Sequence, residues 1–290
     1  MSMKKKYLEN TMRMVFFIAA LTAVASVLLI CIFLFANGIP AMSKIGIFNF
    51  LFGENWSPSD KPASYGILSM VMGSIYVTLG AVIIGVPIGV LTAIFMAKFC
   101  SKRVNAVLKP VVELLAGIPS IIYGFFGLQL LVPFVRTYFG GNGNSILTAS
   151  ILLGVMILPT IIGISQASLE AIDRSYYEGA LALGASHEKS VLKVVVPAAR
   201  SGIMAAVVLG IGRAIGETMA VIMVAGNQAR MPAGLLKGAR TLTSNIVIEM
   251  KYAAELHRGA LIATGVVLLV FILIINLLFA ILKKKANTNQ

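Results

Sequence analysis

Two residues of opposite charge, Arg213 and Glu217, lie near the middle of a long apolar run, residues 201–226. A charged side chain that faced lipid alone there would cost about 2.5 to 3.5 kcal/mol, so we expect both side chains to face inward. Residues four apart share one face of a helix, where these two can neutralise one another or meet groups on a neighbouring helix. Two roles therefore stay open for them: a structural ion pair, or a charged lining for the path of an ionic substrate.

If the two residues line a path, their chemistry is that of anion binding. The guanidinium of Arg213 is planar, permanently charged and forked, which suits the oxygens of a tetrahedral anion. Glu217 would then hold the arginine in place while the path is empty. Glu113, near one end of another apolar run, is less informative, because a surface pair with Lys109 explains its position.

Signatures of catalysis are absent from the sequence. It contains no HExxH, CxxC or GxSxG pattern, and its two histidines, His187 and His257, are far apart. Cys31 and Cys100 fit neither a disulfide framework nor a thiolate metal site. The nucleotide-binding pattern GxxxxGK[ST] is missing as well, so any ATP must be bound by another chain. We expect no catalytic residue, no cofactor and no metal in this chain.

The elements that position Arg213 and Glu217 must be membrane helices. Of the 290 residues, 58% are hydrophobic and only 12% are charged, and the mean hydropathy is +0.92, whereas a soluble domain carries roughly 25% charged residues. The net charge of +13 comes from short basic clusters beside apolar runs. This pattern is typical of membrane topology and excludes a nucleic-acid-binding surface.

Six apolar runs are long enough to cross about 30 Å of hydrocarbon as helices, and they lack the alternation of barrel strands. The predicted fold class is therefore all-α integral membrane, with six transmembrane helices near residues 15–36, 67–97, 111–135, 145–167, 201–226 and 259–282. Within these runs, Gly85 with Gly89 and Gly212 with Gly216 place small residues on one helix face. We expect both pairs to pack against neighbouring helices.

The distribution of basic residues predicts the orientation of the helices. Fifteen of the 24 Lys and Arg residues flank the run ends on the side of the N-terminus, and eight flank the opposite ends. Because cytoplasmic loops carry the excess of Lys and Arg, we predict that both termini are cytoplasmic.

The segment between the fourth and fifth runs, residues 170–200, has the pattern of a helical hairpin. Ser175 and Glu178 form a potential capping box, Gly184 offers a turn, Ser186 can cap a second short helix and Pro197 can close it. Glu178 has a plain capping role in this interpretation, yet such a hairpin is also what a partner protein would grip through an apolar stripe. The stripe expected to be exposed consists of Tyr177, Ala180 and Leu181.

A family resemblance becomes specific in this hairpin. Glu178-Gly179-Ala180, Gly184 and Val194-x-Val196-Pro197 resemble the EAA signature, EAA-x3-G-x9-I-x-LP, of binding-protein-dependent ABC importer permeases. The spacing matches throughout, with Gly for the first Ala and Val for the Ile and Leu. The resemblance implies a type I (MetI-like) permease fold with a cytoplasmic coupling hairpin. It also implies that Glu178, Gly179, Ala180, Gly184 and Pro197 couple the chain to a separate ATPase.

Other segments are similar to phosphate permeases of the PstC type. These are Glu113–Ser120 (ELLAGIPS), Tyr123–Gly127 (YGFFG), Gly212–Val221 (GRAIGETMAV), Arg240–Thr243 (RTLT) and Glu249-Met250. The resemblance implies import of inorganic phosphate by alternating access in a bacterial or archaeal cell (inner) membrane. The implied partners are a second permease of the PstA type, a cytoplasmic ATPase dimer of the PstB type, and an extracytoplasmic phosphate-binding protein of the PstS type, besides membrane lipid.

The resemblance also divides the chain into parts. Residues 1–65 are an N-terminal tail, a first transmembrane helix and an outer loop, residues 66–285 are the ABC permease transmembrane domain with the coupling segment 170–200, and residues 286–290 are a C-terminal tail. Two alternatives remain for the function. One is a permease for another oxyanion, sulfate or molybdate, because an arginine suits any tetrahedral anion. The other is a passive anion channel or a membrane scaffold, neither of which needs an ATPase-docking hairpin.

Overall fold

The computed structural model describes residues 3–288, with side chains described for residues 9–281. The chain is mostly helical, apart from two short antiparallel strands, β1 (Trp56–Ser57) and β2 (Ser64–Tyr65). The α-helices are α1 (Met3–Ile45), α2 (Ile47–Phe52), α3 (Leu68–Ile94), α4 (Lys102–Gly117), α5 (Ser120–Phe126), α6 (Val132–Tyr138), α7 (Ile146–Glu170), α8 (Arg174–Ala182), α9 (His187–Ser190), α10 (Val196–Ala198), α11 (Arg200–Gly216), α12 (Met219–Val224), α13 (Leu242–Met250) and α14 (Glu255–Thr288). Three π-helical segments, η1 (Phe95–Phe99), η2 (Gly127–Leu131) and η3 (Val191–Val195), continue α3, α5 and α9.

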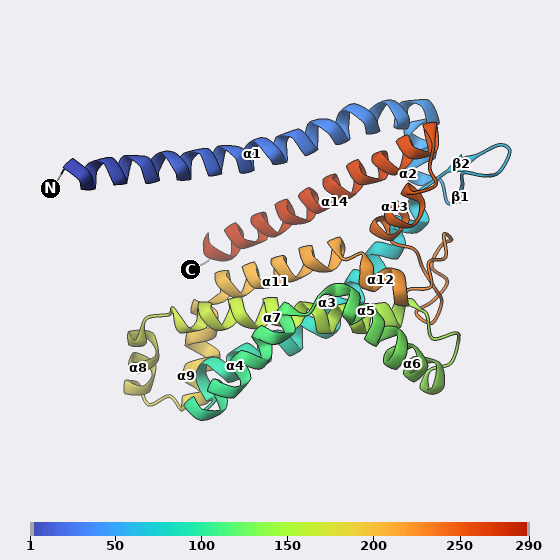
Figure 1. Cartoon of the computed structure of the whole chain (residues 1–290). Helices are drawn as coiled ribbons and strands as arrows, with labels where there is room; N and C mark the ends of the chain where they lie inside the picture. Colours follow the sequence, from blue (N-terminus) through green and yellow to red (C-terminus); the bar gives the residue numbers. More distant parts are fainter. Residues whose placement is uncertain (1–2, 289–290) are drawn as a thin grey trace.

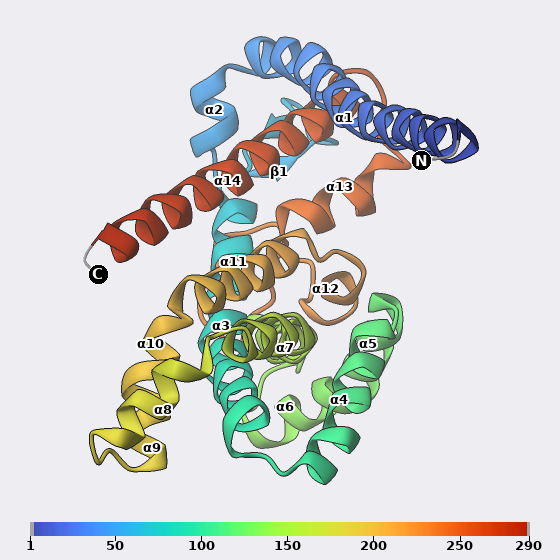
Figure 2. The same cartoon turned by 90° about the vertical axis from the view of Figure 1, so that its left-hand side faces the viewer.

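The molecule has two distinct ends, which are visible in Figure 1. The hairpin end carries α8 and α9, and both chain termini lie toward this end. The loop end carries α2, the β1–β2 pair and the connections α6–α7 and α12–α13. Viewed along the bundle in Figure 2, α7 lies near the centre, with α3, α11, α12 and α5 around it. The all-α membrane fold predicted from the sequence is confirmed.

The core is built on α7. Its most extensive contacts are with α3 and α11, and its residues Ile146, Ile157 and Ile161 are fully buried. The hydroxyl of Ser150 donates to the carbonyl of Val77 at 3.2 Å and so joins α7 to α3. Because lipid tails are as apolar as these side chains, close packing and such bonds hold membrane helices together.

Gly85 and Gly89 confirm the packing predicted for the first glycine pair. A Cβ atom at Gly85 would lie 2.7 Å from the carbonyl oxygen of Gly154, and one at Gly89 would lie 2.8 Å from Cγ2 of Ile161. Only glycine lets the backbone of α3 approach α7 this closely.

The packing predicted for Gly212 and Gly216 is not found within the described part of the chain. A Cβ atom at either position would have no described atom within 4 Å. The glycine of α11 that packs against α7 is Gly210, where a Cβ atom would lie 2.9 Å from Cγ1 of Ile161. The face of α11 that carries Gly212 and Gly216 is therefore open to space that the described chain does not fill.

Within the described residues, five helices are long and apolar enough to cross a membrane: Glu9–Ile45, Leu68–Phe99, Ser120–Tyr138, Ile146–Glu170 and Glu255–Ile281. A sixth span results if His187–Ala198 and Arg200–Gly216, which meet at 68°, are taken as one broken span. Five of the six predicted runs thus overlap a candidate span, whereas the predicted run 201–226 overlaps the bent pair only over residues 201–216. Two of the runs also differ in form from the continuous helices expected.

The third run is one of these two, because it begins at Ser120 instead of near residue 111. The chain breaks at Ile118, whose backbone is extended before Pro119, as steric contact with a proline ring favours. The preceding helix α4 is amphipathic and has no buried residue. Glu113 therefore lies on α4 and not inside a span, and within the described range it forms no ion pair with Lys109.

A polar network at the loop end ties the N-terminal part of the chain to the rest. The carboxylate of Glu249 in α13 accepts hydrogen bonds from Nε1 of Trp56 at 2.7 Å and from Arg240, and it lies 2.9 Å from Nε2 of His257. Arg240 also donates to the carbonyl of Asn227 at 3.0 Å. The network joins β1, α13, α14 and the α12–α13 connection, so the connections at this end are fixed in place.

The end of α14 bears on the predicted C-terminal tail. Residues 286–288 continue the helix, whereas residues 289–290 lie outside the described part of the chain.

The two glycine environments predict opposite outcomes for one substitution. Gly85→Ala should lower the stability of the folded chain by about 1 to 3 kcal/mol, because the added methyl group overpacks the α3–α7 contact. Gly212→Ala is the matched control, since it brings the same gain in helix propensity, about 1 kcal/mol, without a clash. Thermal unfolding in detergent measures both variants. Equal loss of stability in the two would contradict the assignment of their faces.

Candidate functional site

The fifth apolar run is broken at Glu217. Helix α11 ends at Gly216, Glu217 has an extended backbone (φ −68°, ψ 132°) and α12 begins at Met219. The expectation that Arg213 and Glu217 lie four residues apart on one continuous helix is therefore wrong. The carboxylate of Glu217 instead accepts hydrogen bonds from the backbone N–H groups of Thr218 at 3.1 Å and Ala220 at 3.3 Å.

This capping is the physical reason for the break. The first N–H groups of a helix have no partner within the helix, and in a membrane water does not replace them. Glu217 satisfies two of these groups at the start of α12, and its negative charge is favoured there by the helix dipole. The carboxylate serves the backbone of α12, and no ion pair joins it to Arg213 among the described side chains.

Arg213 is held from another helix. Its NH1 group donates to the hydroxyl oxygen of Thr160, in α7, at 3.2 Å. Most of its other N–H donors have no acceptor among the described residues, and the side chain is half-buried. A guanidinium that is oriented by one neutral hydroxyl and not neutralised by a carboxylate is available to an anion.

Thr160 was not identified from the sequence. The only signal was a hydroxyl residue beside Pro159 within the fourth apolar run, and nothing in that pattern links it to Arg213.

The break at Glu217 is fixed by bonds from other elements. The hydroxyl of Thr243, at the start of α13, donates to the carbonyl oxygen of Glu217 at 3.1 Å. The backbone N–H of Leu242 donates to Ser74 of α3 at 3.0 Å, which anchors α13. Because α13 is anchored in this way, the position of the break relative to α3 is set by the tertiary structure.

The third apolar run, which is broken before Ser120, meets the fifth run near the break that follows Arg213. A Cβ atom at Gly124 in α5 would lie 3.0 Å from Cα of Ala220, so α5 and α12 are in close contact. Tyr123 of α5 is buried and donates to the carbonyl of Leu115 at 2.8 Å. That bond spans the break before α5. Two discontinuous helices thus come together close to Arg213 and Glu217, an arrangement typical of ion sites in transporters.

The hairpin predicted between the fourth and fifth runs is present. Its first helix, α8, is capped by Asp173 and not by Ser175: the carboxylate accepts from the N–H of Ser175 at 2.8 Å, and this bond holds the pKa of Asp173 below its usual range. Gly184 forms the turn with φ +83°, which favours glycine. Ser186 caps α9, as expected.

The hairpin has an inner side and an outer side. Tyr177 faces inward, where its hydroxyl lies 2.7 Å from Nδ1 of His187, and the ring of His187 packs on Phe99 at 4.8 Å between centroids. Leu181 is exposed, as predicted, and the other exposed apolar residues are Tyr176 (53% exposed) and Leu183 (90% exposed). The prediction that Tyr177 belongs to the exposed stripe is wrong, because its ring covers the cluster formed with Val191 and Val195.

The residues of the EAA-like motif lie on both sides of this turn. Glu178 and Gly179 are exposed on α8, and Ala180 is half-buried. Pro197 lies in α10, just before the 68° bend into α11. The hairpin is therefore continuous with the helix that carries Arg213, and α8 and α12 lie toward opposite ends of α11 (Figure 1).

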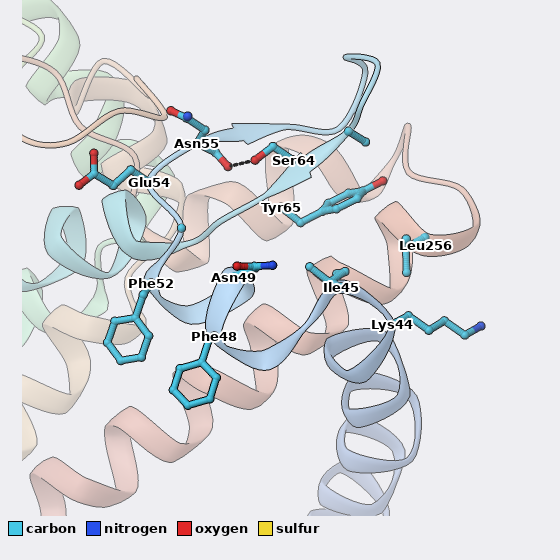
Figure 3. A pocket seen from close by; sticks show the side chains of 12 residues that line it. Lys44, Ile45, Phe48, Asn49, Phe52, Glu54, Asn55, Ser64, Tyr65 and Leu256 are labelled. Atoms are coloured by element: carbon cyan, nitrogen blue, oxygen red, sulfur yellow. Dashed lines mark hydrogen bonds between the residues drawn. The ribbon is translucent and has the colours of Figure 1, made fainter.

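Another cavity, shown in Figure 3, lies at the loop end, away from Arg213. It is a space of about 700 Å³ lined by the end of α1, by α2 and by the strand β2. Lys44 and Glu54 lie on different sides of it, and a bond of 2.7 Å from Ser64 to the carbonyl of Asn55 closes the strand side. Phe48 is mostly exposed. Because the cavity is lined by both a cation and a carboxylate, it has no preference for an anion.

A metal centre finds no support in the geometry. Among the described residues, no cluster of three or more His, Cys, Asp and Glu side chains could hold an ion.

Known proteins are similar to this chain in sequence over most of its length. The model of the family described as "Binding-protein-dependent transport system inner membrane component" matches residues 85–288. The chain is 41% identical to the probable ABC transporter permease protein YqgH of Bacillus subtilis (strain 168), over 92% of this chain and 89% of that protein. It is 35% identical to the phosphate transport system permease protein PstC of Mesorhizobium japonicum, over 85% and 81%.

Solved structures agree on the fold. A chain of a bacterial alginate ABC transporter in complex with a pentasaccharide-bound periplasmic protein superposes with a TM-score of 0.62 at 16% identity, covering 92% of this chain and 96% of that one. A chain of the inward-facing MetNI methionine ABC transporter gives a TM-score of 0.56 at 21% identity, covering 76% and 94%.

The separate partners of Arg213 and Glu217 predict independent effects of their removal. Glu217→Ala should lower the stability of the chain by about 0.5 to 2 kcal/mol, because α12 loses its cap. Adding Arg213→Gln should change stability by the sum of the single effects, within about 0.5 kcal/mol. A double-mutant cycle measured by thermal unfolding checks this. If Arg213→Gln rescued the Glu217→Ala variant, a direct ion pair would be required.

Proposed function

The chain belongs to the family of binding-protein-dependent transport system inner membrane components, and on that premise we propose that it is a permease subunit of an ATP-driven importer for inorganic phosphate. The observation that carries the proposal is the guanidinium of Arg213, held by Thr160 without a neutralising carboxylate at the meeting point of two broken helices. The relatives named as phosphate permeases support the choice of anion.

Arg213 acts in this proposal as the residue that binds the anion during passage. Its fork can engage two phosphate oxygens at once, and a half-buried position strengthens that contact relative to water. Thr160 positions the guanidinium and keeps it oriented between transport cycles. Glu217 takes part indirectly, because it caps α12 and so preserves the break beside which Arg213 lies. The chain performs no chemistry on phosphate.

Transport requires partners that face the two ends. In the proposed orientation the hairpin end and both termini are cytoplasmic, and the loop end is extracytoplasmic. An ATPase dimer of the PstB type grips the outer side of the hairpin, where Leu183 is almost fully exposed. A phosphate-binding protein of the PstS type delivers phosphate at the loop end. A second permease of the PstA type completes the cavity, and the open face at Gly212 and Gly216 is a suitable place for it.

The alternatives are weaker on physical grounds. Sulfate or molybdate would also suit a guanidinium, but no feature of the described residues favours them. A passive anion channel or a scaffold has no use for a hairpin that exposes Tyr176, Leu181 and Leu183 together, since a group of exposed apolar side chains favours a protein contact.

The assignment of Arg213 predicts loss of uptake without loss of assembly. Arg213→Gln should abolish uptake of radiolabelled phosphate in cells that lack other phosphate importers, normalised to the amount of assembled complex. Arg213→Lys keeps the charge but loses the fork, so it should retain partial uptake with altered selectivity. Arg136→Gln, at the loop end of α6, is a control that should transport normally. Normal uptake by Arg213→Gln would exclude the role proposed for this residue.

The hairpin predicts a defect confined to coupling. Leu183→Asp should prevent the ATPase from copurifying with the permease, because a charge would have to be desolvated in the docking contact. The chain itself should insert and fold normally, since Leu183 makes no buried contact. Tyr252→Asp, at the loop end, is the matched control for an exposed apolar residue. Copurification that survives Leu183→Asp would contradict the proposed docking surface.

A further inference from the structure

A second cavity at the loop end differs from the others in its charge. It has a volume of about 260 Å³ and lies between the α6–α7 and α12–α13 connections. Its polar lining residues are Asn142, Asn144, Gln228, Arg230 and Lys237. It carries two cations and three amide side chains, and none of its described lining residues is a carboxylate.

The two cations are available to a ligand. Neither Arg230 nor Lys237 takes part in an ion pair within the described part of the chain, where the carboxylate of Glu249 is instead paired with Arg240 and His257. Both side chains are exposed. A recess lined by cations and amide donors concentrates small anions, because the surrounding protein focuses the field into it.

The backbone of the cavity is fixed before any ligand arrives. The N–H groups of Ile146 and Leu147, at the start of α7, donate to the carbonyls of Lys237 and Leu235 at 3.0 and 2.9 Å. The N–H of Ala239 donates to the carbonyl of Ala225 at 2.9 Å. A site held in this way loses little entropy on binding, so even partly solvated contacts contribute to affinity.

The cavity lies beyond the end of α12, the helix at whose start the chain breaks after Arg213. Helix α12 has six residues and is therefore about 9 Å long. The break beside Arg213 is at its start, and Gln228 of the cavity follows its end by a few residues. Along the chain, only α12 and a short turn at Gly226 and Asn227 separate the break from the cavity lining.

We propose that this cavity is a second anion site, an entrance site that holds inorganic phosphate or a similar oxyanion before it reaches Arg213. The identity of the anion and the outward orientation rest on the proposed function. The recessed shape favours a small ion over an acidic side chain of a docked protein, and the test separates the two.

Protection of a cysteine inside the cavity tests the proposal in the assembled complex. Ala233→Cys, in a background of Cys31→Ser and Cys100→Ser, places a thiol in the lining without removing a proposed ligand. An uncharged, membrane-impermeant maleimide should label it from outside in intact cells. Inorganic phosphate should slow the labelling, whereas chloride at equal ionic strength should not.

The cavity cations should control this protection. Arg230→Gln and Lys237→Gln should each raise the phosphate concentration for half-protection about five-fold, which corresponds to about 1 kcal/mol per partly solvated ion contact. Lys251→Gln, an exposed cation at the same end but outside the cavity, is the matched control and should change nothing. Arg213→Gln should abolish uptake and leave protection intact, so the two sites can fail separately.

Three outcomes would overturn the proposal. They are no protection by phosphate, protection that survives both cavity substitutions, and protection by the phosphate-binding protein but not by free phosphate. The last would identify the cavity as a protein-docking surface. Labelling only after lysis would overturn the proposed orientation. Phosphate protection measured in the opened membranes would then still show whether the cavity binds phosphate.

Discussion

The hydrogen bonds from the start of α12 to the carboxylate of Glu217 are the interaction on which the candidate site depends. A membrane helix cannot break unless its freed backbone groups find partners, because lipid supplies none. Glu217 supplies them from within the chain. The same bonds orient the carboxylate toward the backbone of α12, and among the described residues it forms no ion pair with Arg213. Glu217 therefore stabilises the break, while Arg213 is bonded to Thr160 and keeps further donors for an anion.

The break has a defined position because the central helix α7 organises what surrounds it. Gly85 and Gly89 bring α3 against α7, and Gly210 does the same for α11. Thr160 of α7 then reaches Arg213. Close backbone contact, which only glycine permits, thus sets the distance at which a hydroxyl of one helix can orient the guanidinium of another.

The two ends of the bundle present different side chains: charged groups at the loop end and apolar groups at the hairpin end. At the loop end, Glu249 is surrounded by donors and holds the connections together, while Arg230 and Lys237 form no ion pair with any described residue beside the recess. At the hairpin end, the outer side exposes Leu183 and Tyr176, and the inner side is closed by Tyr177 and His187. The loop end has fixed connections, which suits the reception of an anion. The hairpin end has an exposed apolar surface, which suits contact with a partner that moves the chain.

Some properties follow from the sequence alone, because they depend on local composition or on short-range geometry. The apolar runs determine a helical membrane protein. Gly184 and Ser186 determine the turn of the hairpin, since a positive φ and a helix cap are satisfied within a few residues. The spacing of Gly85 and Gly89 likewise determines a helix-packing face.

Other properties were decided only by the tertiary structure. Spacing placed Arg213 and Glu217 on one face of an assumed continuous helix, but whether that helix continues depends on bonds from Thr243 and on the anchoring of α13 to Ser74. The same limit applies to Gly212 and Tyr177, because a periodic pattern does not say which neighbour covers a face. The partner of Arg213 was decided by α7, far away in the sequence, since only packing brings Thr160 within hydrogen-bond distance of the guanidinium.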